Sequence, residues 1–519
     1  MQAEFALQAG DLEGAAKGYA AAALVSDQVQ LIERAATVSL YAKDYAAADA
    51  VGSRWLRVEP ASIGARRTLA WSALARTQAE LADRYLAELA AIGGLEAQRA
   101  IAQVLVAAEN RKDAPASLRR LAAAGVLVPL PHGPSWSAVA SNLGDYPTAV
   151  RLAGLETQAE PKSAEAWRRS AQVLLAAGDK AGARKSLERA LELSPEDFEL
   201  RLALAGVLAD AGRVDLADRV LAKAKPQDDR ALAARLANAA SKADPKILKR
   251  IERDLLDSKG TKVHSRAFLL GQLYELREQP DKALSWYSKE PEGATWHEAQ
   301  LRRGVLTARE LSDVAGARAL LAAARQQVAD VDQQIDAYLL EAELVLPTDR
   351  KAAGSVYDEA VTRFPQDFRL RYARALFRIA DDDVSGLEQD LRSILKVDPD
   401  NPQALNALGY TLADRTDRHQ EALGYIERAF ARHPDDGAFV DSMGWVQFRL
   451  GHLEDALRHL RRAFELVQDG EVAAHLGEVL WASKLHEEAR QHWREALKRW
   501  PDSAPLRDSV RRLQPELLP

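Results

Sequence analysis

Histidine and carboxylate side chains near the C-terminus are the groups best suited to metal or acid–base chemistry, but their spacing fits no known site. Zinc hydrolases place two histidines four residues apart, with a glutamate after the first. The nearest match begins at His486 and Glu487, yet the second histidine position holds Arg490. Seven of the ten histidines lie between His419 and His492, on different predicted helices and without ligand spacing. We interpret them as solvated surface groups.

An acidic run at Asp381, Asp382 and Asp383 is the other candidate for ion binding. It lacks the glycine that a calcium loop requires, and aspartate is a natural helix cap, so we expect a turn here. Phosphate-binding loops, dinucleotide fingerprints and nucleophile elbows are missing from the sequence. With no grouping of nucleophile, base and orienting residue, we predict a protein that is not an enzyme and has no metal, cofactor or small-molecule substrate.

Composition narrows the remaining classes of function. The 519 residues carry a formal net charge of −6, and no long basic block is present, which argues against nucleic-acid binding. Cysteine is absent, and no apolar stretch approaches the roughly 20 residues of a membrane span. The N-terminal MQAEFALQAG lacks the basic and apolar regions of a signal peptide and begins part-way through a helical pattern. We expect that a targeting segment lies upstream of it.

Helix-forming residues dominate the chain, and a small residue recurs along it at a nearly constant interval. Between Ala16 and Ala489 the mean step is about 34 residues, which is typical of two-helix repeats. Degenerate units near Ile251 and at Leu387 fill the two longer gaps. The recurring alanines are Ala16, Ala48, Ala82, Ala116, Ala149, Ala183, Ala217, Ala283, Ala317, Ala353, Ala422, Ala456 and Ala489.

Other positions keep the same register. The expected interhelical turns read AAGDKAGA at 176–183, DAGRVDLA at 210–217 and RLGHLEDA at 449–456. A large residue precedes a small one in the first helix, as in Leu408–Gly409 and Met443–Gly444, so that a neighbouring helix can cross closely. Prolines close the second helix because proline cannot continue it: Pro60, Pro161, Pro195, Pro365, Pro399, Pro434 and Pro501.

In these features the chain resembles the tetratricopeptide repeat family over nearly its whole length. The resemblance implies an all-α, right-handed superhelical solenoid of about 14–15 helical hairpins. We expect one continuous superhelix over residues 1–501, with its weakest repeats at 225–262 and 290–335. Residues 502–519 are expected to form a C-terminal capping helix and tail, because a solenoid must cover its last open face.

Ligand contacts in this family come from fixed positions of the first helix of each hairpin, on the concave face. Projected onto the C-terminal repeats, the predicted protein-binding residues are Asn406, Tyr410, Asp441, Trp445, Phe448, Glu478 and Trp481. Tyrosine and tryptophan are typical interface anchors. The alternative is that some of these rings pack between neighbouring repeats. The lysine- and asparagine-rich clamp of chaperone-tail adaptors is absent, since no lysine accompanies Asn406.

A closer resemblance rests on three C-terminal runs. They are NALGYTLADRTDRHQEALGYIERAFARHPDD, DSMGWVQFRLGHLEDALRHLRRAFEL and HLGEVLWASKLHEEARQHWREAL. These runs, with the ADRTDR insertion, look like the large tetratricopeptide lipoproteins of Pseudomonas and related Gram-negative bacteria that bind the periplasmic carboxyl-terminal processing protease. The resemblance implies a lipid anchor on a cysteine upstream of Met1 and a location on the periplasmic face of the outer membrane. It also implies that the chain activates this serine protease and brings it peptidoglycan cross-link hydrolases as substrates.

Two other functions compete with this adaptor. One is a scaffold for an envelope assembly or for exopolysaccharide secretion, which would place a β-barrel after the repeats. Another is an enzyme whose repeats precede a catalytic domain, as in glycosyl transferases. Because the repeat pattern continues into a capping helix, we favour the adaptor. We also expect the protease and its substrates to use separate surfaces.

Overall fold

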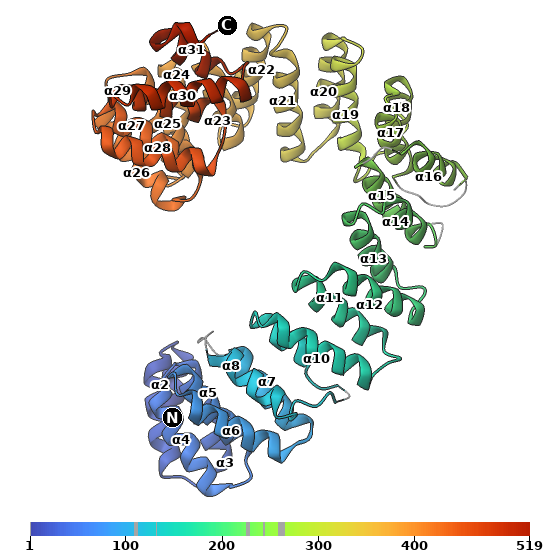
Figure 1. Ribbon diagram of the computed structural model, residues 1–519, viewed down its shortest axis with the longest axis vertical. Coiled ribbons are helices and arrows are strands. Elements are labelled where there is room, and N and C mark those ends of the chain that lie inside the picture. Colours follow the sequence, from blue (N-terminus) through green and yellow to red (C-terminus); the bar gives the residue numbers. More distant parts are fainter. Residues whose placement is uncertain are drawn as a thin grey trace. The chain divides into compact units, whose positions relative to one another are not determined.

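The computed structural model describes residues 2–107, 113–130, 132–224, 229–241, 244–257 and 265–518. Over these ranges the chain forms 31 α-helices and one short 3₁₀ helix, with no β-strand (Figure 1). The all-α prediction is therefore confirmed. The chain divides into two compact units, Met1–Arg277 and Glu278–Pro519. In neither unit does a described helix have the length and apolar character needed to cross a membrane.

The first unit is a series of helical hairpins in which most helices pack on the next, whereas α8 packs on α7 and α10. Its helices are α1 (Gln2–Gln8), α2 (Leu12–Leu24), α3 (Val29–Tyr41), α4 (Tyr45–Val58), α5 (Ile63–Ala75), α6 (Ala79–Ile92), α7 (Gly94–Ala107), α8 (Asp113–Ala123), α9 (Trp136–Asn142), α10 (Tyr146–Ala159), α11 (Ala164–Ala176), α12 (Lys180–Leu193), α13 (Phe198–Asp210), α14 (Val214–Leu221), α15 (Asp229–Ala240), α16 (Pro245–Asp257) and α17 (Arg266–Leu276).

The second unit repeats the pattern and ends in a single helix. Its elements are α18 (Pro280–Tyr287), α19 (Trp296–Arg309), α20 (Val314–Gln327), α21 (Val331–Val345), α22 (Arg350–Arg363), α23 (Phe368–Ile379), α24 (Val384–Val397), α25 (Pro402–Arg415), α26 (His419–Arg432), α27 (Gly437–Arg449), α28 (Leu453–Leu466), α29 (Gly470–Ala482), α30 (His486–Arg499), α31 (Ala504–Leu513) and the 3₁₀ helix η1 (Pro515–Leu517).

Several hairpin turns combine a residue in the left-handed conformation with an aspartate cap on the second helix. Between α11 and α12, Gly178 adopts a φ of +83°, and the Asp179 carboxylate accepts a hydrogen bond from the backbone N–H of Gly182 at 2.8 Å. Glycine takes this left-handed conformation without steric cost, and the aspartate satisfies an N–H at the start of the second helix. The acidic run behaves as expected, because Asp383 caps α24 by accepting from the Gly386 N–H at 2.8 Å.

Helix ends also follow the sequence pattern. Every one of the seven prolines expected to close a second helix lies two residues beyond the helix end; α30, for example, ends at Arg499 before Pro501. The weak repeats are helical too: α15 and α16 occupy the described part of 225–262, and α19 and α20 fall within 290–335. Residues 225–228, 242–243 and 258–264 lie outside the described residues. Past Pro501, α31 covers the last hairpin by burying Leu506 and Val510 against it.

The recurring alanines lie where the helices of a hairpin cross. Twelve of the thirteen are fully buried, with no exposed surface. Ala116 is the exception, because it is only half-buried, whereas the adjacent Ser117 is fully buried. The expected register is therefore wrong by one residue in α8.

Glycines in the first helices of the C-terminal hairpins allow a closer crossing still. A Cβ atom added at Gly444 would lie 2.6 Å from Cγ of Leu460, and one at Gly477 would lie 2.0 Å from the indole nitrogen of Trp493. Normal van der Waals contact needs about 3.5–4.0 Å, so neither position has room for a side chain. The large–small pattern in the sequence thus corresponds to direct helix–helix contact.

We predict that Gly477→Ala lowers the thermal midpoint of unfolding, with a cost of about 1–3 kcal/mol, because Trp493 must move. Gly424→Ala in α26 is the matched control, since a Cβ there meets nothing within 4 Å. It should be neutral or stabilising by roughly 0.5–1 kcal/mol, as alanine favours helix. Circular dichroism melts of the two variants check this. An equal effect of both substitutions would contradict the close-crossing argument.

Candidate functional site

A groove of about 670 Å³ runs along the first helices of the last three hairpins, and we call it the C-terminal groove. Helix α25 packs on α27, α27 on α29, and α29 on the closing helix α31 (Figure 1). Residues from all four helices line the groove. The lining residues are Tyr410, Asp414, Arg415, Trp445, Phe448, Arg449, Glu471, Ala474, His475, Glu478, Ala504, Pro505, Asp508, Ser509 and Arg512.

The floor of the groove is a buried polar network centred on His475. Its Nδ1 lies 2.9 Å from the nearer carboxylate oxygen of Asp441, one hairpin earlier. The ring of Trp445 stacks on the imidazole, with centroids 4.2 Å apart and planes 26° from parallel. The Tyr410 hydroxyl donates to Glu471 at 2.9 Å and lies 3.3 Å from Nε2 of His475. Side chains from three successive hairpins therefore fix one another in position.

Burial and the surrounding charges act in opposite directions on the pKa of His475. Burial, the largest single influence, lowers the pKa of the imidazole, but Asp441, Glu471 and Glu478 together raise that pKa above its ordinary value of 6.5. Burial, and then the nearby Glu471 carboxylate, raise the pKa of the Tyr410 hydroxyl, which stays protonated and donates. The carboxylates around His475 thus favour the charged form of its imidazole, and such a buried pair stabilises only while each charge keeps its partner.

Charged groups of both signs form the rim. Arg449 donates to the backbone carbonyl of Asp414 at 2.8 Å, and the Asp414 carboxylate accepts from the indole of Trp445 at 3.2 Å. On the opposite side, Arg512 of α31 pairs with the buried Glu478 of α29. The side chains of Arg415 and Arg512 are 47% and 61% exposed, so both are accessible to a partner.

The structure brings five of the seven predicted residues together. Tyr410, Trp445, Phe448 and Glu478 line the groove, and Asp441 lies behind it, holding His475. Trp445 is 6% exposed, so it forms the floor and presents only an edge. That these residues bind protein stays a prediction.

Asn406 and Trp481 do not line the groove. The Asn406 side-chain oxygen is buried, and no described residue gives it a hydrogen bond. The Trp481 ring packs against His486 and Trp493, with centroids 4.1 and 6.0 Å apart, and Arg490 lies over it. Trp481 therefore packs between the two helices of its own hairpin, an arrangement that neither interpretation of the sequence predicted.

His475 is the central residue that the sequence did not reveal. We expected the C-terminal histidines to be solvated, and this prediction is wrong for His475, which is 6% exposed. Burial also lowers the pKa values of His459 and His492. One signal was present in the sequence: His475 lies one helical turn after Glu471 and nearly one turn before Glu478, so all three share a helix face.

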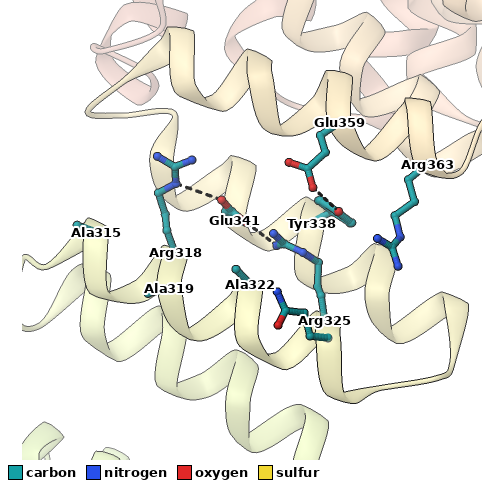
Figure 2. Close-up of a pocket in the computed structure, with 10 residues that line it drawn as sticks. Ala315, Arg318, Ala319, Ala322, Arg325, Tyr338, Glu341, Glu359 and Arg363 are labelled. Carbon is teal, nitrogen blue, oxygen red and sulfur yellow. Dashed lines mark hydrogen bonds and ion pairs between the residues drawn. The ribbon is translucent and has the colours of Figure 1, made fainter.

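A second cavity, of about 510 Å³, lies among α20, α21 and α22 (Figure 2). Its centre is the buried Glu341, whose two carboxylate oxygens accept from Arg318 and Arg325. The Arg325 guanidinium lies over the Tyr338 ring, 3.9 Å from its centroid, and the Tyr338 hydroxyl donates to Glu359 at 2.6 Å. These groups largely satisfy one another, so the cluster joins three helices.

The described linings of the two cavities differ in chemistry from a site with an activated nucleophile. The C-terminal groove contains no serine, cysteine or lysine beside a base, and Ser509 is buried. A search of the described residues finds no group of three or more histidine, cysteine or acidic side chains that could hold a metal ion. The C-terminal groove presents aromatic edges and charged groups of both signs, which suit recognition of a partner.

Comparison with known proteins agrees with the hairpin geometry. Residues 174–240, 388–437 and 442–504 match the tetratricopeptide repeat family. A relative from Pseudomonas aeruginosa, the TPR repeat-containing protein PA4667, is 41% identical over 218 residues. That alignment covers 42% of this chain but only 36% of the relative, so the chain matches little more than a third of that protein's length.

Two solved structures are among those to which the chain shows some similarity. A tetratricopeptide repeat protein from Parabacteroides merdae is 15% identical, with a TM-score of 0.38 over 48% of this chain and 97% of that one. The Cut9–Hcn1 hetero-tetramer of the APC/C is 16% identical, with a TM-score of 0.34 over 99% of this chain and 95% of that one. The hairpins within residues 174–240, 388–437 and 442–504 therefore match tetratricopeptide repeats, and the described chain is an all-α solenoid of helical hairpins.

We predict that the stabilising effect of the His475–Asp441 pair depends on pH. Because the folded-state pKa of His475 is raised, its contribution is fully present below pH 6.5 and is lost as the pH rises through the folded-state pKa. The difference in thermal midpoint between the wild type and His475→Gln should therefore shrink between pH 6 and pH 9. The control, His452→Gln, removes an exposed imidazole. A difference that is constant across this range would contradict the prediction.

Proposed function

We propose that this tetratricopeptide-repeat solenoid is a non-catalytic scaffold that binds a carboxyl-terminal processing serine protease, raises its activity and delivers protein substrates to it. The substrates we propose are peptidoglycan cross-link hydrolases. The proposed location is the periplasmic face of the outer membrane, reached through a lipid anchor upstream of Met1. The protease and substrate identities come from the sequence resemblance, whereas the scaffold role draws on the site itself.

The C-terminal groove is the observation that carries the proposal. Tetratricopeptide repeats mediate protein–protein interactions, and this groove has a rigid floor and a mixed-charge rim. The network of Asp441, His475 and Trp445 fixes its shape before a partner arrives, which reduces the entropy lost on binding. The exposed Arg415 and Arg512 face a partner on either side of that floor. Such a surface suits a folded protein better than a small molecule.

The proposed delivery of substrate to the protease depends on a chain long enough to carry two separate binding surfaces. A chain that binds protease and substrate at separate surfaces raises the effective concentration of one near the other, without contributing any catalytic group. Tetratricopeptide-repeat proteins are generally non-catalytic scaffolds of this kind. The proposal of separate surfaces would fail if one point substitution abolished both interactions while the chain remained folded.

A degradation assay tests the proposed function. Purified carboxyl-terminal processing protease is incubated with a candidate peptidoglycan hydrolase, with and without this chain, and complexes are followed by size-exclusion chromatography. We expect faster loss of the hydrolase and co-elution of the chain with the protease. If the chain neither binds nor accelerates the protease, the adaptor assignment is wrong.

The rim charges supply the matched variants. Arg415→Glu/Arg512→Glu reverses two exposed groove charges and should weaken protease or substrate binding about tenfold, because charge complementarity across an interface is lost. The control, Arg458→Glu/Arg461→Glu, makes the same charge change on α28, away from the groove. Each double variant is titrated into the degradation assay, and the concentrations that give half-maximal acceleration are compared. Equal behaviour of the two would exclude the C-terminal groove as a contact surface.

A further inference from the structure

A second groove lies in the first unit and has a different chemistry; we call it the N-terminal groove. It follows the first helices α3, α5 and α7, which pack on one another in that order (Figure 1). Two cavities make it up, of about 650 and 510 Å³. Arg67 and Gln103 line both cavities, and the Arg67 guanidinium donates to the Gln103 side-chain oxygen at 3.2 Å. The two cavities are therefore halves of one channel.

The half near the C-terminal ends of these helices is apolar. Tyr41, Trp71 and Val106 line it, one from each helix, together with Leu40 and small side chains. Tyr41 is 73% exposed and Val106 is 56% exposed, although large apolar side chains are normally covered. Three aromatic or aliphatic groups from three repeats thus form one exposed apolar cavity, a feature typical of a binding surface.

The half near the N-terminal ends carries carboxylates. Glu33, Glu59 and Glu96 line it, against the guanidinium groups of Arg67 and Arg99. Arg99 donates to the backbone carbonyl of His132 at 3.0 Å, and Arg67 to Gln103, so both cations are engaged by neutral oxygens. Within the described residues, the carboxylates of Glu33 and Glu96 have no hydrogen-bond or ion-pair partner. The three carboxylates outnumber the two guanidinium groups, so the lining is net negative and favours a cation beside Glu33 and Glu96.

Helix geometry sets the distance between the two halves. Tyr41 follows Glu33 by eight residues in α3, and Val106 follows Glu96 by ten residues in α7. At about 1.5 Å of rise per residue, both pairs are about 12–15 Å apart. An extended chain covers that distance in about four residues, because each contributes about 3.3 Å. A helix would need eight to ten.

We propose that the N-terminal groove binds an extended segment of a partner protein that carries a large apolar side chain and, about four residues away, a lysine or arginine. The apolar side chain enters the cavity between Tyr41, Trp71 and Val106. The basic side chain lies between the carboxylates of Glu33 and Glu96. This specificity is separate from the C-terminal groove and does not depend on the identity of the protease.

Selection from a random peptide library tests the specificity. Twelve-residue peptides displayed on phage are selected on the full chain and, in parallel, on Tyr41→Ser/Val106→Ser. Both substitutions change exposed side chains, so the fold should be retained. We expect enrichment on the wild type alone of peptides with an apolar and a basic residue about four positions apart. Three results would overturn the proposal. They are enrichment of acidic peptides, enrichment of peptides whose apolar and basic residues are eight to ten positions apart as in a helix, and equal enrichment on both chains.

Affinity measurements separate the two halves. A synthetic copy of the most enriched peptide should bind at least about tenfold more weakly to Glu33→Gln/Glu96→Gln, because two attractive charges are lost. It should bind normally to Glu80→Gln/Glu196→Gln, which removes two exposed carboxylates elsewhere in the unit. Val25→Ser/Ile92→Ser is the control for the apolar half, since both residues are exposed outside the groove. Unchanged affinity of Glu33→Gln/Glu96→Gln would overturn the charge argument.

A second copy of this chain is the remaining occupant of the N-terminal groove to be excluded. Sedimentation velocity of the wild type at increasing concentration should show the same species as the Tyr41→Ser/Val106→Ser variant. A dimer that disappears in that variant would mean that the groove is occupied by a second copy of the chain, and would overturn the proposal.

Discussion

Close crossing of the two helices within a hairpin is the constraint on which the structure depends. At the crossing point, alanine or glycine leaves space for a neighbouring backbone, as Ala422 does with no exposed surface and as Gly444 does against Leu460. A larger residue would push the helices apart and open the contact to the next hairpin. Since each hairpin packs mainly on its neighbours, the spacing set at one crossing fixes how the first helices line up. The grooves exist because those helices stay in register.

Lining the grooves with first helices has a chemical consequence. A helix presents one residue per turn to a given face, so a groove made of three or four helices samples single side chains from distant parts of the sequence. The C-terminal groove brings Tyr410, Asp441 and His475 together from three hairpins. No local motif encodes such a group. The same arrangement can therefore produce a polar network at one end of the chain and an apolar cavity at the other, with no change of fold.

The sequence predicts most of the fold because its repeat signals are local. Prolines two residues beyond helix ends and aspartates at helix starts act within a few residues, and they place the hairpins almost to the residue. The failure at Ala116 is instructive: a one-residue shift in α8 exchanges it with Ser117, and the small size of both residues hides the shift. Composition alone cannot separate two small side chains that are both able to fill the crossing point.

The candidate site is predicted less well because its contacts are not local. Projection of family positions finds Tyr410, Trp445, Phe448 and Glu478 in the groove but misplaces Trp481, whose ring turns toward His486 in its own hairpin. It misses His475 because burial of a histidine depends on what the neighbouring hairpins place against it. Asp441 and Trp445 supply that environment from 34 and 30 residues away. Pattern reasoning treats each helix face separately, so it cannot show this pairing.

The two grooves differ in how their charges are used, and this difference bears on what each can select. In the C-terminal groove Glu478, Asp441 and Asp414 already accept from Arg512, His475 and Trp445, so a partner that binds these carboxylates must compete with existing bonds. In the N-terminal groove, Glu33 and Glu96 have no such partners within the described residues. A cation entering there gains attraction without breaking a bond inside the protein. Charge selection in the first unit therefore uses carboxylates without described partners, whereas in the second unit the exposed rim charges act together with a preformed surface.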